Sequence, residues 1–350
     1  MNFEILKLAF SNFRGVIADY AFFKYNLDFT YPTQIYVETN TSCNSKCLMC
    51  DNWRIQHLND DLAASIWINA LKELKSINRN LIVCFAGGEV LLKKDIFDIF
   101  KFCNENDICF TITTNGKLLN QNNVKKLFEL EPFNINISLD SLNPIIYHEI
   151  RGIDSLEQVK ANIKFIVKYK KKVKSKTMLN LKTIVCNKNL NEIEEIVKYS
   201  HETGFNSITL QPIFKTTKEA KEMFRIDKQH LNYVINKLIT MKKDGYIIAN
   251  SVENILNWMN YFDEGHHNKS YQCTVPLKSV YIRADGNMYF CEWHRISIGN
   301  IKKQNVRELL SSKKTRVLKK KLAYCKKPCV YCIQRTIRDY IKIFYNYLKN

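Results

Sequence analysis

Short apolar runs alternate with longer amphipathic stretches between about residues 34 and 214. The apolar runs predict six strands, at Gln34–Glu38, Leu81–Phe85, Ile108–Thr113, Asn134–Leu139, Met178–Val185 and Ser207–Leu210. The stretches between them predict five helices, at Ala63–Ile77, Asp95–Asn104, Asn122–Glu129, Leu156–Tyr169 and Leu190–Thr203. Strands that alternate with helices favour a parallel sheet covered by those helices. We therefore expect an α/β fold, a partial six-unit TIM-like β/α barrel.

The chain continues on both sides of this region. An amphipathic N-terminal helix is predicted from apolar residues at helical spacing, namely Ile5, Leu6, Ala9, Phe10 and Phe13. Towards the C-terminus, helices are predicted over Asp227–Lys243 and Val252–Phe262, and Arg283–Gly286 separates two apolar runs that predict a β-hairpin. We therefore divide the chain into an N-terminal extension (1–33), a barrel core (34–250) and a small C-terminal α+β domain (251–350).

Composition narrows the classes of protein that fit. Hydrophobic residues make up 46% of the 350 residues, enough to bury a substantial core. The formal net charge of +19 fits either an anionic partner or a solvated basic surface. Nucleic acid is the less favoured partner, because the basic runs Lys168–Lys176 and Lys313–Lys321 carry few of the interleaved aromatic residues that stack on bases.

The location of the protein affects how its cysteines are interpreted. Met1–Tyr20 shows no secretion signal, and no stretch approaches the roughly 18 uncharged apolar residues that span a bilayer. We therefore expect a cytoplasmic protein without a membrane span. In that reducing compartment twelve cysteines are not expected to form a disulfide framework, so clustered ones indicate metal binding or catalysis. Four others are expected to be ordinary buried residues: Cys84, Cys103, Cys109 and Cys186.

Three cysteines follow the first predicted strand. Cys43, Cys47 and Cys50 form C-x3-C-x2-C, and active residues of parallel α/β folds lie at the carboxyl ends of strands. Iron–sulfur clusters usually take four cysteines, so three ligands would leave one iron open to a cofactor or substrate. A zinc site with its fourth ligand elsewhere in the chain is the alternative.

Five more cysteines occupy the C-terminal region. Cys273 and Cys291 flank the predicted hairpin, and Cys325, Cys329 and Cys332 repeat the C-x3-C-x2-C spacing. Four cysteines at such spacings suit either an iron–sulfur cluster or a structural zinc. This region is therefore expected to hold a second metal centre.

The first cysteine motif resembles the defining motif of the radical S-adenosylmethionine (radical SAM) superfamily. The pattern around Cys273, Gly286 and Cys291 resembles the auxiliary-cluster domain of its SPASM and twitch subgroup. The resemblance implies a 4Fe-4S cluster held by the first three cysteines, which binds and cleaves S-adenosylmethionine to a 5′-deoxyadenosyl radical. It also implies an auxiliary 4Fe-4S cluster held by Cys273, Cys291, Cys329 and Cys332. Cys325 would replace one of these ligands or stay free to receive an electron or substrate.

The resemblance also implies the residues that contact the cofactor. Gly87, Gly88 and Glu89 resemble the GGE motif of the family, which receives the amino group of the cofactor through its backbone. Further contacts are expected from Asn115, Ser138, Asp140 and Arg151. Capping of strand ends is the alternative for Ser138 and Asp140, and a surface position is the alternative for Arg151.

The resemblance leaves the substrate open. It implies abstraction of hydrogen from an unactivated carbon, with the auxiliary cluster accepting an electron and a reductant such as flavodoxin or ferredoxin supplying one. We favour a peptide or protein substrate. Oxidation of an alcohol in a carbohydrate or an antibiotic-type small molecule is the alternative, and a zinc-stabilised basic RNA-binding protein is a third hypothesis, of another class.

Overall fold

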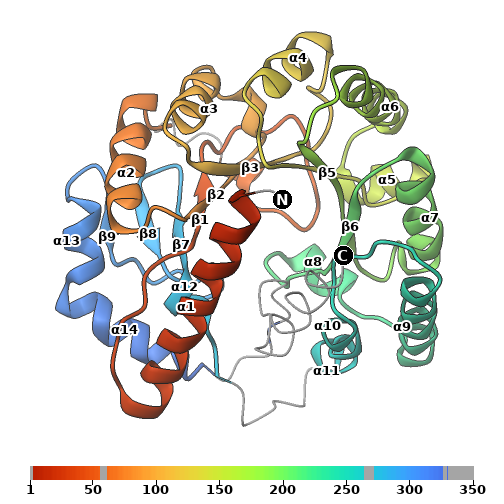
Figure 1. The fold of residues 1–350 in the computed structure, drawn as a ribbon. Coiled ribbons are helices and arrows are strands. Elements are labelled where there is room, and N and C mark those ends of the chain that lie inside the picture. The colour runs from red at the N-terminus through yellow and green to blue at the C-terminus, as the bar shows by residue number, and fades with distance from the viewer. Residues whose placement is uncertain (1–2, 56–60, 264–271, 326–328, 330–350) are drawn as a thin grey trace.

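The computed structural model of the chain describes residues 3–55, 61–263, 272–325 and 329 (Figure 1). In these residues the strands form one sheet in the order β6-β5-β4-β3-β2-β1-β7-β8-β9. The strands are β1 (Gln34–Glu38), β2 (Ile82–Ala86), β3 (Cys109–Thr114), β4 (Asn134–Ser138), β5 (Met178–Val185), β6 (Ser207–Pro212), β7 (Ser279–Ile282), β8 (Asn287–Tyr289) and β9 (Gly299–Asn300). Strands β1 to β6 are parallel, so the predicted α/β architecture is confirmed.

Helices cover the outer side of the parallel strands (Figure 1). Those that connect the parallel strands are α2 (Ala64–Ile77), α3 (Ile96–Glu105), α4 (Gln121–Glu129), α5 (Pro144–Arg151), α6 (Leu156–Val173) and α7 (Ile193–Thr203). Those that follow β6 are α8 (Lys218–Met223), α9 (Lys228–Lys243), α10 (Val252–Leu256) and α11 (Trp258–Phe262). The helix predicted over Val252–Phe262 is therefore two short helices, which meet at Asn257.

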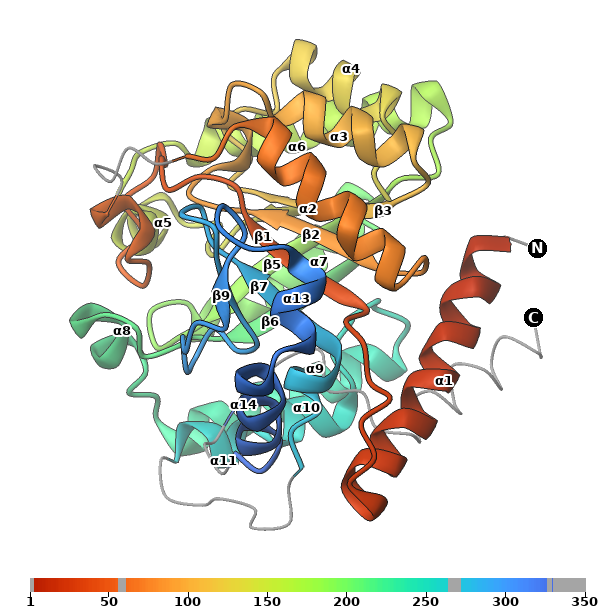
Figure 2. The ribbon, with the colours of Figure 1, turned by 90° about the vertical axis from the view of Figure 1, so that its left-hand side faces the viewer.

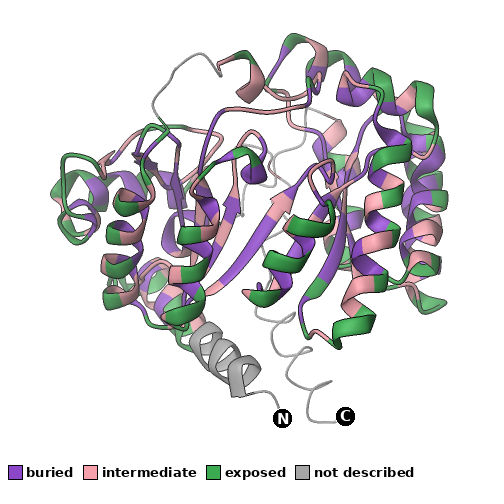
Figure 3. Ribbon diagram, turned by 90° about the horizontal axis from the view of Figure 1, so that it is seen from above, coloured by how far each residue is buried: buried purple, intermediate pink, exposed green. Residues whose placement is uncertain are grey.

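The hydrophobic core lies between the sheet and these helices (Figure 3). Alternate residues of β1 show the reason, because Ile35 and Val37 are buried against helices while Tyr36 and Glu38 face the inside of the barrel. The inner face is polar. Asn180 of β5, for example, donates to Asn136 Oδ1 (2.9 Å) from the neighbouring strand. The barrel thus separates an apolar outer layer from a polar, half-buried interior.

The C-terminal region continues the barrel sheet. Strand β7 pairs with β1 in parallel, and β7, β8 and β9 are antiparallel, so the predicted hairpin around Arg283–Gly286 is confirmed. The helices of this region are α12 (Val275–Lys278), α13 (Val306–Ser311) and α14 (Lys313–Ala323). The auxiliary region is therefore built directly onto the first strand of the barrel.

The N-terminal helix α1 (Phe3–Tyr25) lies to one side of the barrel, apart from its strands (Figure 2). Near its C-terminal end, Phe22 packs with Leu277 of α12 and Ala323 of α14, and Asp19 forms an ion pair with Lys278. The structure does not describe the side chains at the predicted apolar positions Ile5, Leu6, Ala9, Phe10 and Phe13. Among the helices that the structure describes, none is long and apolar enough to cross a membrane.

Candidate active site

The carboxyl ends of the parallel strands carry most of the residues that the sequence singled out. These are Cys43, Cys47 and Cys50 after β1, Gly87, Gly88 and Glu89 after β2, Asn115 after β3, and Ser138 and Asp140 at the end of β4. Because all these strands are parallel, their carboxyl ends lie at one rim of the barrel. The candidate site is this rim.

Two glycines bring the end of β2 against the cysteine loop. Gly88 N donates to the carbonyl of Asn40 (2.8 Å), and Glu89 N donates to the carbonyl of Ser42 (2.8 Å). A Cβ atom on Gly88 would lie 2.1 Å from the Ser42 carbonyl oxygen, and one on Gly87 would lie 2.4 Å from Asn40 Oδ1. No side chain fits at either position, so glycine is required for the two segments to approach this closely.

The side chain of Glu89 holds the end of β2 to the end of β3. It is 1% exposed, and its carboxylate accepts hydrogen bonds from Thr114 Oγ1 (2.7 Å), Asn115 N (2.8 Å) and Leu91 N (3.2 Å). Burial raises the pKa of Glu89, and these three donors oppose the shift. The carboxylate is therefore satisfied within the protein, at the base of the rim.

Asn115 reaches from β3 into the cysteine loop. Its Nδ2 donates to Asn44 Oδ1 (2.6 Å) and Ser45 Oγ (3.3 Å) and lies 4.0 Å from Cys43 Sγ. Lys117 Nζ donates to the carbonyl of Asn44 (2.9 Å) and supports the same turn. The predicted contact residue Asn115 thus lies beside the first cysteine.

Arg151 lies beside the second cysteine and is buried. Only 7% of it is exposed, so the alternative that it lies on the surface is wrong. Its Nε lies 2.7 Å from Asp140 Oδ2, in a close ion pair rather than an aligned hydrogen bond, and its Nη1 lies 3.8 Å from Cys47 Sγ. Burial acts to lower the pKa of Arg151, but Asp140 and Cys47 hold it above its ordinary value, so the guanidinium stays charged.

Arg151 is the last residue of helix α5, which the sequence analysis did not predict. The helix is short and begins at Pro144, with Asn143 Oδ1 accepting from Ile145 N (2.9 Å). It ends at Gly152, whose φ is +65°, and there Lys46 N donates to the Arg151 carbonyl (3.1 Å). The Asn-Pro start and the glycine just past the end are the signals that could have predicted it.

Three further side chains hold the cysteine loop from other directions. Trp53 Nε1 donates to the Cys47 carbonyl (3.0 Å), Thr217 Oγ1 to that of Leu48 (2.8 Å) and Thr216 Oγ1 to that of Met49 (2.8 Å). The threonines follow β6, at the far edge of the sheet from β7. Sequence reasoning missed them because threonine and tryptophan carry no local signal for such a role.

The three thiols of the loop fit a cluster-binding site. Burial, reinforced by repulsion from the neighbouring thiols, raises the pKa of Cys43 to about 11 and that of Cys50 to about 12. Such thiols are neutral near neutral pH, so a metal centre is needed to hold them as thiolates. The N–H groups of Asn115 and Arg151 lie next to two of the sulfurs, where they would stabilise a thiolate. The arrangement therefore fits an iron–sulfur cluster with three cysteine ligands.

A second group of thiols gathers behind the hairpin. Cys273 N donates to the carbonyl of Ala323 (2.9 Å), which brings the start of α12 to the end of α14, just before Cys325. The thiols of Cys273, Cys291 and Cys325 lie within electrostatic reach of one another, and burial raises the pKa of Cys273 to about 12. Cys325 Sγ also lies 3.1 Å from His294 Nε2. Three cysteines from separate segments therefore meet here.

The other two predicted ligands of this centre are less fully described. Cys329 lies near Tyr261. Burial raises the pKa of the Tyr261 phenol, and the nearby Cys329 raises it further. Cys332 lies outside the described residues. The predicted set of Cys273, Cys291, Cys329 and Cys332 stays a prediction, to which the structure adds a position for Cys325. In the part of the chain that is described, no three His, Cys, Asp or Glu side chains are placed to hold a single metal ion. A four-iron cluster, by contrast, spreads its thiolates over several irons.

Two protein-family models match the chain, one at each cysteine group. The model of the radical SAM superfamily matches residues 37–200. The chain is a radical SAM enzyme. The model of SPASM, an iron–sulfur cluster-binding domain, matches residues 273–333 of this radical SAM enzyme, including all five C-terminal cysteines.

Known proteins resemble this radical SAM enzyme over most of its length. The tungsten-containing aldehyde ferredoxin oxidoreductase cofactor-modifying protein of Pyrococcus furiosus is 22% identical over 88% of this chain and 89% of its own. SuiB of Streptococcus suis, solved bound to the precursor peptide SuiA, has a TM-score of 0.68 at 17% identity over 91% of this chain and 76% of its own. The enzyme anSMEcpe, solved with AdoMet and a peptide, has a TM-score of 0.63 at 18% identity over 84% of each chain.

These matches confirm several predictions. The radical SAM and SPASM domains imply 4Fe-4S clusters and S-adenosylmethionine as cofactors, as expected from the cysteine motifs. The two family matches contradict the hypothesis of a zinc-stabilised RNA-binding protein. The domain boundaries near 33 and 250 and the roles of the individual site residues stay predictions.

Proposed function

We propose that this enzyme modifies a peptide or protein substrate in the cytoplasm by oxidation at an unactivated carbon. When bound, the cluster at Cys43, Cys47 and Cys50 supplies the electron that cleaves S-adenosylmethionine to a 5′-deoxyadenosyl radical. A flavodoxin or ferredoxin would provide that electron. The protein's own residues position the cofactor, exclude water from the rim and hold the substrate carbon near it.

One observation carries the proposal, namely that the fold supports both cysteine groups and connects them to the same strand. Asn115 and Arg151 flank the first group, and β7 attaches the second group to the same strand, β1, that leads into the first. Both groups are therefore attached to the same sheet. An enzyme that only cleaved S-adenosylmethionine would have no use for the second group.

Most of the predicted cofactor residues have a place in this proposal. The backbone of Gly87–Glu89 lies at the rim beside the cysteine loop and would receive the cofactor's amino group. Ser138 ends β4 on the half-buried inner face and would contact the ribose. Asp140 and Arg151 neutralise each other, so we propose that this pair orients Arg151 towards the cluster, with the carboxylate of the cofactor as a further partner of the guanidinium.

The preference for a peptide rests on two relatives. SuiB and anSMEcpe are both solved with bound peptides, and this chain shares their folds over 91% and 84% of its length. The barrel interior supports a polar substrate segment, because Asn136, Asn180 and Thr209 line it. Lys182 lies on the same inner face, in register with Ser138, and would suit an acidic or carbonyl group of the substrate.

The first experiment is anaerobic reconstitution followed by iron, sulfide and zinc analysis and a dithionite assay for 5′-deoxyadenosine. We expect about eight irons per chain, two four-iron clusters, with deoxyadenosine formed from S-adenosylmethionine. Zinc without cleavage would refute the proposal. The substrate class is tested by adding candidate peptides encoded near the gene, and modification of a small-molecule alcohol but of no peptide would refute the peptide assignment.

A further inference from the structure

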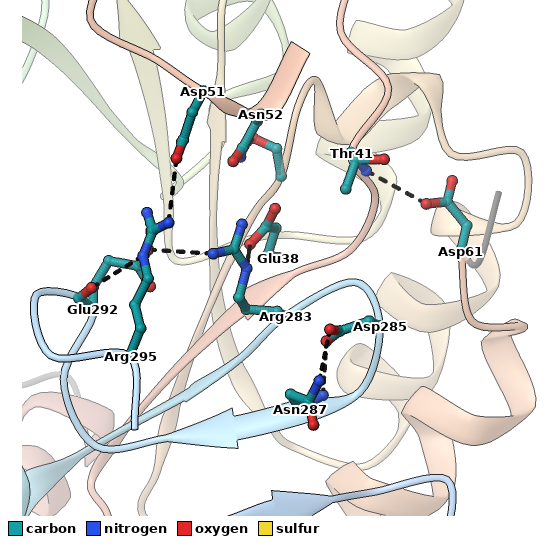
Figure 4. Close-up of polar contacts among 11 residues, drawn as sticks. Glu38, Thr41, Asp51, Asn52, Asp61, Arg283, Asp285, Asn287, Glu292 and Arg295 are labelled. Carbon is teal, nitrogen blue, oxygen red and sulfur yellow. Dashed lines mark hydrogen bonds and ion pairs between the residues drawn. The ribbon is translucent and has the colours of Figure 1, made fainter. Parts of the chain in front are cut away.

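A chain of ion pairs joins the loops that carry the two cysteine groups (Figure 4). Asp51 Oδ2 lies 3.2 Å from Arg295 Nη1, and Arg295 Nη2 lies 2.8 Å from Glu292 Oε1. The same Glu292 oxygen lies 3.9 Å from Arg283 Nη1, and Arg283 Nε lies 3.0 Å from Glu38 Oε2. We call these five residues the charge bridge.

Two members of the charge bridge directly follow cysteines in the chain. Asp51 follows Cys50 in the chain, and Glu292 follows Cys291. Arg295 N also donates to the carbonyl of Cys291 (3.0 Å), so a single turn connects the guanidinium to that cysteine. Among the described residues, the ion pair between Arg295 and Asp51 directly ties one cysteine loop to the other.

The backbone of Arg295 is in an unusual conformation. Its φ is +44°, in the left-handed region, which costs a non-glycine residue about 1 kcal/mol or more. Such a conformation persists only when other contacts hold it. Here Arg295 Nε donates to the Glu292 carbonyl (3.2 Å). Its two terminal nitrogens form ion pairs with the carboxylates of Asp51 and Glu292. The contacts of the guanidinium thus offset the backbone strain.

The other end of the charge bridge is anchored inside the barrel. Arg283 and Glu38 are only 13% and 14% exposed at their side chains, and Glu38 lies at the carboxyl end of β1. Burial raises the pKa of Glu38 to about 7, and Arg283 opposes the shift. A buried pair depends on both partners, whereas an isolated exposed pair contributes only about 0–1 kcal/mol. The bridge therefore has a fixed inner end and a partly exposed outer end.

The segment from Cys291 to Arg295 makes contacts in several directions. Trp293 meets Phe214, beyond β6, with ring centroids 5.7 Å apart, and His294 meets Cys325. Arg295 alone of these side chains reaches the cysteine loop after β1, among the contacts that the structure describes. Arg295 therefore ties this segment to that loop.

We propose that Arg295 is a positioning residue that fixes the auxiliary-cluster loop against the first-cluster loop and places a positive charge between these two loops. The proposal rests on the proposed function, because it assumes a cluster at each cysteine group. Positive charge near a cluster raises its reduction potential. Loss of the guanidinium leaves Asp51 and Glu292 uncompensated, so both potentials should fall.

The test is an EPR-monitored redox titration of the reconstituted holoprotein, comparing wild type with Arg295→Gln, Arg295→Lys and Asp51→Asn. Arg295→Gln should lower both midpoint potentials, and Arg295→Lys should restore them in part, because it keeps the charge but only one of the two contacts. Asp51→Asn removes a negative charge and should raise the potentials. The matched control is Arg225→Gln, which removes an arginine–glutamate pair of the same i,i+3 spacing on an exposed surface.

The opposite signs separate a placed charge from simple loss of structure. General disruption would move the potentials of Arg295→Gln and Asp51→Asn in the same direction and would overturn the proposal. Unchanged potentials in Arg295→Gln would overturn it too. If Arg295→Gln loses its iron, Arg295→Lys and Asp51→Asn still give the two signs. Wild-type protein that holds zinc would refute the proposed function, whereas two clusters with unmoved potentials would refute only the bridge.

Discussion

The two cysteine groups are assembled in different ways. Cys43, Cys47 and Cys50 share one loop, and the ends of neighbouring strands hold that loop through Asn115 and Gly87–Glu89. Cys273, Cys291 and Cys325 come instead from three separate segments, just before α12, just after β8 and just after α14. The first group needs parallel strands in register, whereas the second needs packing between segments far apart in sequence. The first site is therefore built into the barrel, and the second is attached to it.

The largest expected effect separates the two groups by function. Cys47→Ala should reduce deoxyadenosine formation to background, because the cluster loses one of its three thiolates. Iron should fall from about eight to about four per chain. Iron analysis and the dithionite assay measure both. Cys103→Ala, in the buried face of α3, is the control, and retained cleavage in Cys47→Ala would refute the first-cluster assignment.

The reverse experiment should leave the first group working. Cys273→Ala with Cys291→Ala should remove about four irons per chain while deoxyadenosine still forms without substrate. The two groups are held by different contacts, so the barrel site has no need of the second. Loss of both clusters in this variant would show that the groups do not assemble independently.

The support of the first group can be broken without touching a cysteine. Arg151→Gln leaves Asp140 buried and unpaired, so the free energy of unfolding of the metal-free protein should fall by about 3–5 kcal/mol. Urea denaturation measures this, with Lys101→Gln as the control, because Lys101 pairs with Glu105 on an exposed face of α3. Adding Asp140→Asn should recover part of the loss, and full additivity of the two changes would contradict a coupled pair.

The ligand set of the second group can be sharpened by a matched pair. Cys325→Ser should weaken auxiliary-cluster retention, because Cys325 lies with Cys273 and Cys291 in the structure. Cys329→Ser is its counterpart, from the set that the sequence predicted. Iron content after gel filtration compares the two. An effect of Cys329→Ser alone would mean that the thiol of Cys325 is not a ligand.

The smallest effect concerns the link between the groups. Burial raises the pKa of Glu38 from 4.5 to about 7. Glu292 also raises this pKa, whereas Arg283 and Arg295 lower it. The folded state therefore binds more protons than the unfolded state between these values, so stability should fall as pH rises from about 4.5 to 7. In Glu38→Gln this part of the pH dependence should disappear. Urea titrations across that range measure it, and identical slopes in both proteins would refute the shift.

Much of this architecture could be predicted from local patterns. Strands β1 and β5 begin and end where the apolar periodicity placed them, because burial of alternate faces is written into nearby residues. The two C-x3-C-x2-C motifs were equally accessible, since each is a short spacing along the chain. Helix α5 was missed, because its capping residues are a weak signal in a segment of eight residues.

The sequence by itself determined the parallel α/β order, the hairpin and the identity of the cysteines, because these depend on neighbours along the chain. Tertiary structure alone decided that Arg151 is buried between Asp140 and Cys47, that Cys325 joins Cys273 and Cys291, and that Arg295 reaches Asp51. Most of these contacts join residues that are far apart in sequence. Their partners depend on strand register and helix packing, which no local pattern encodes.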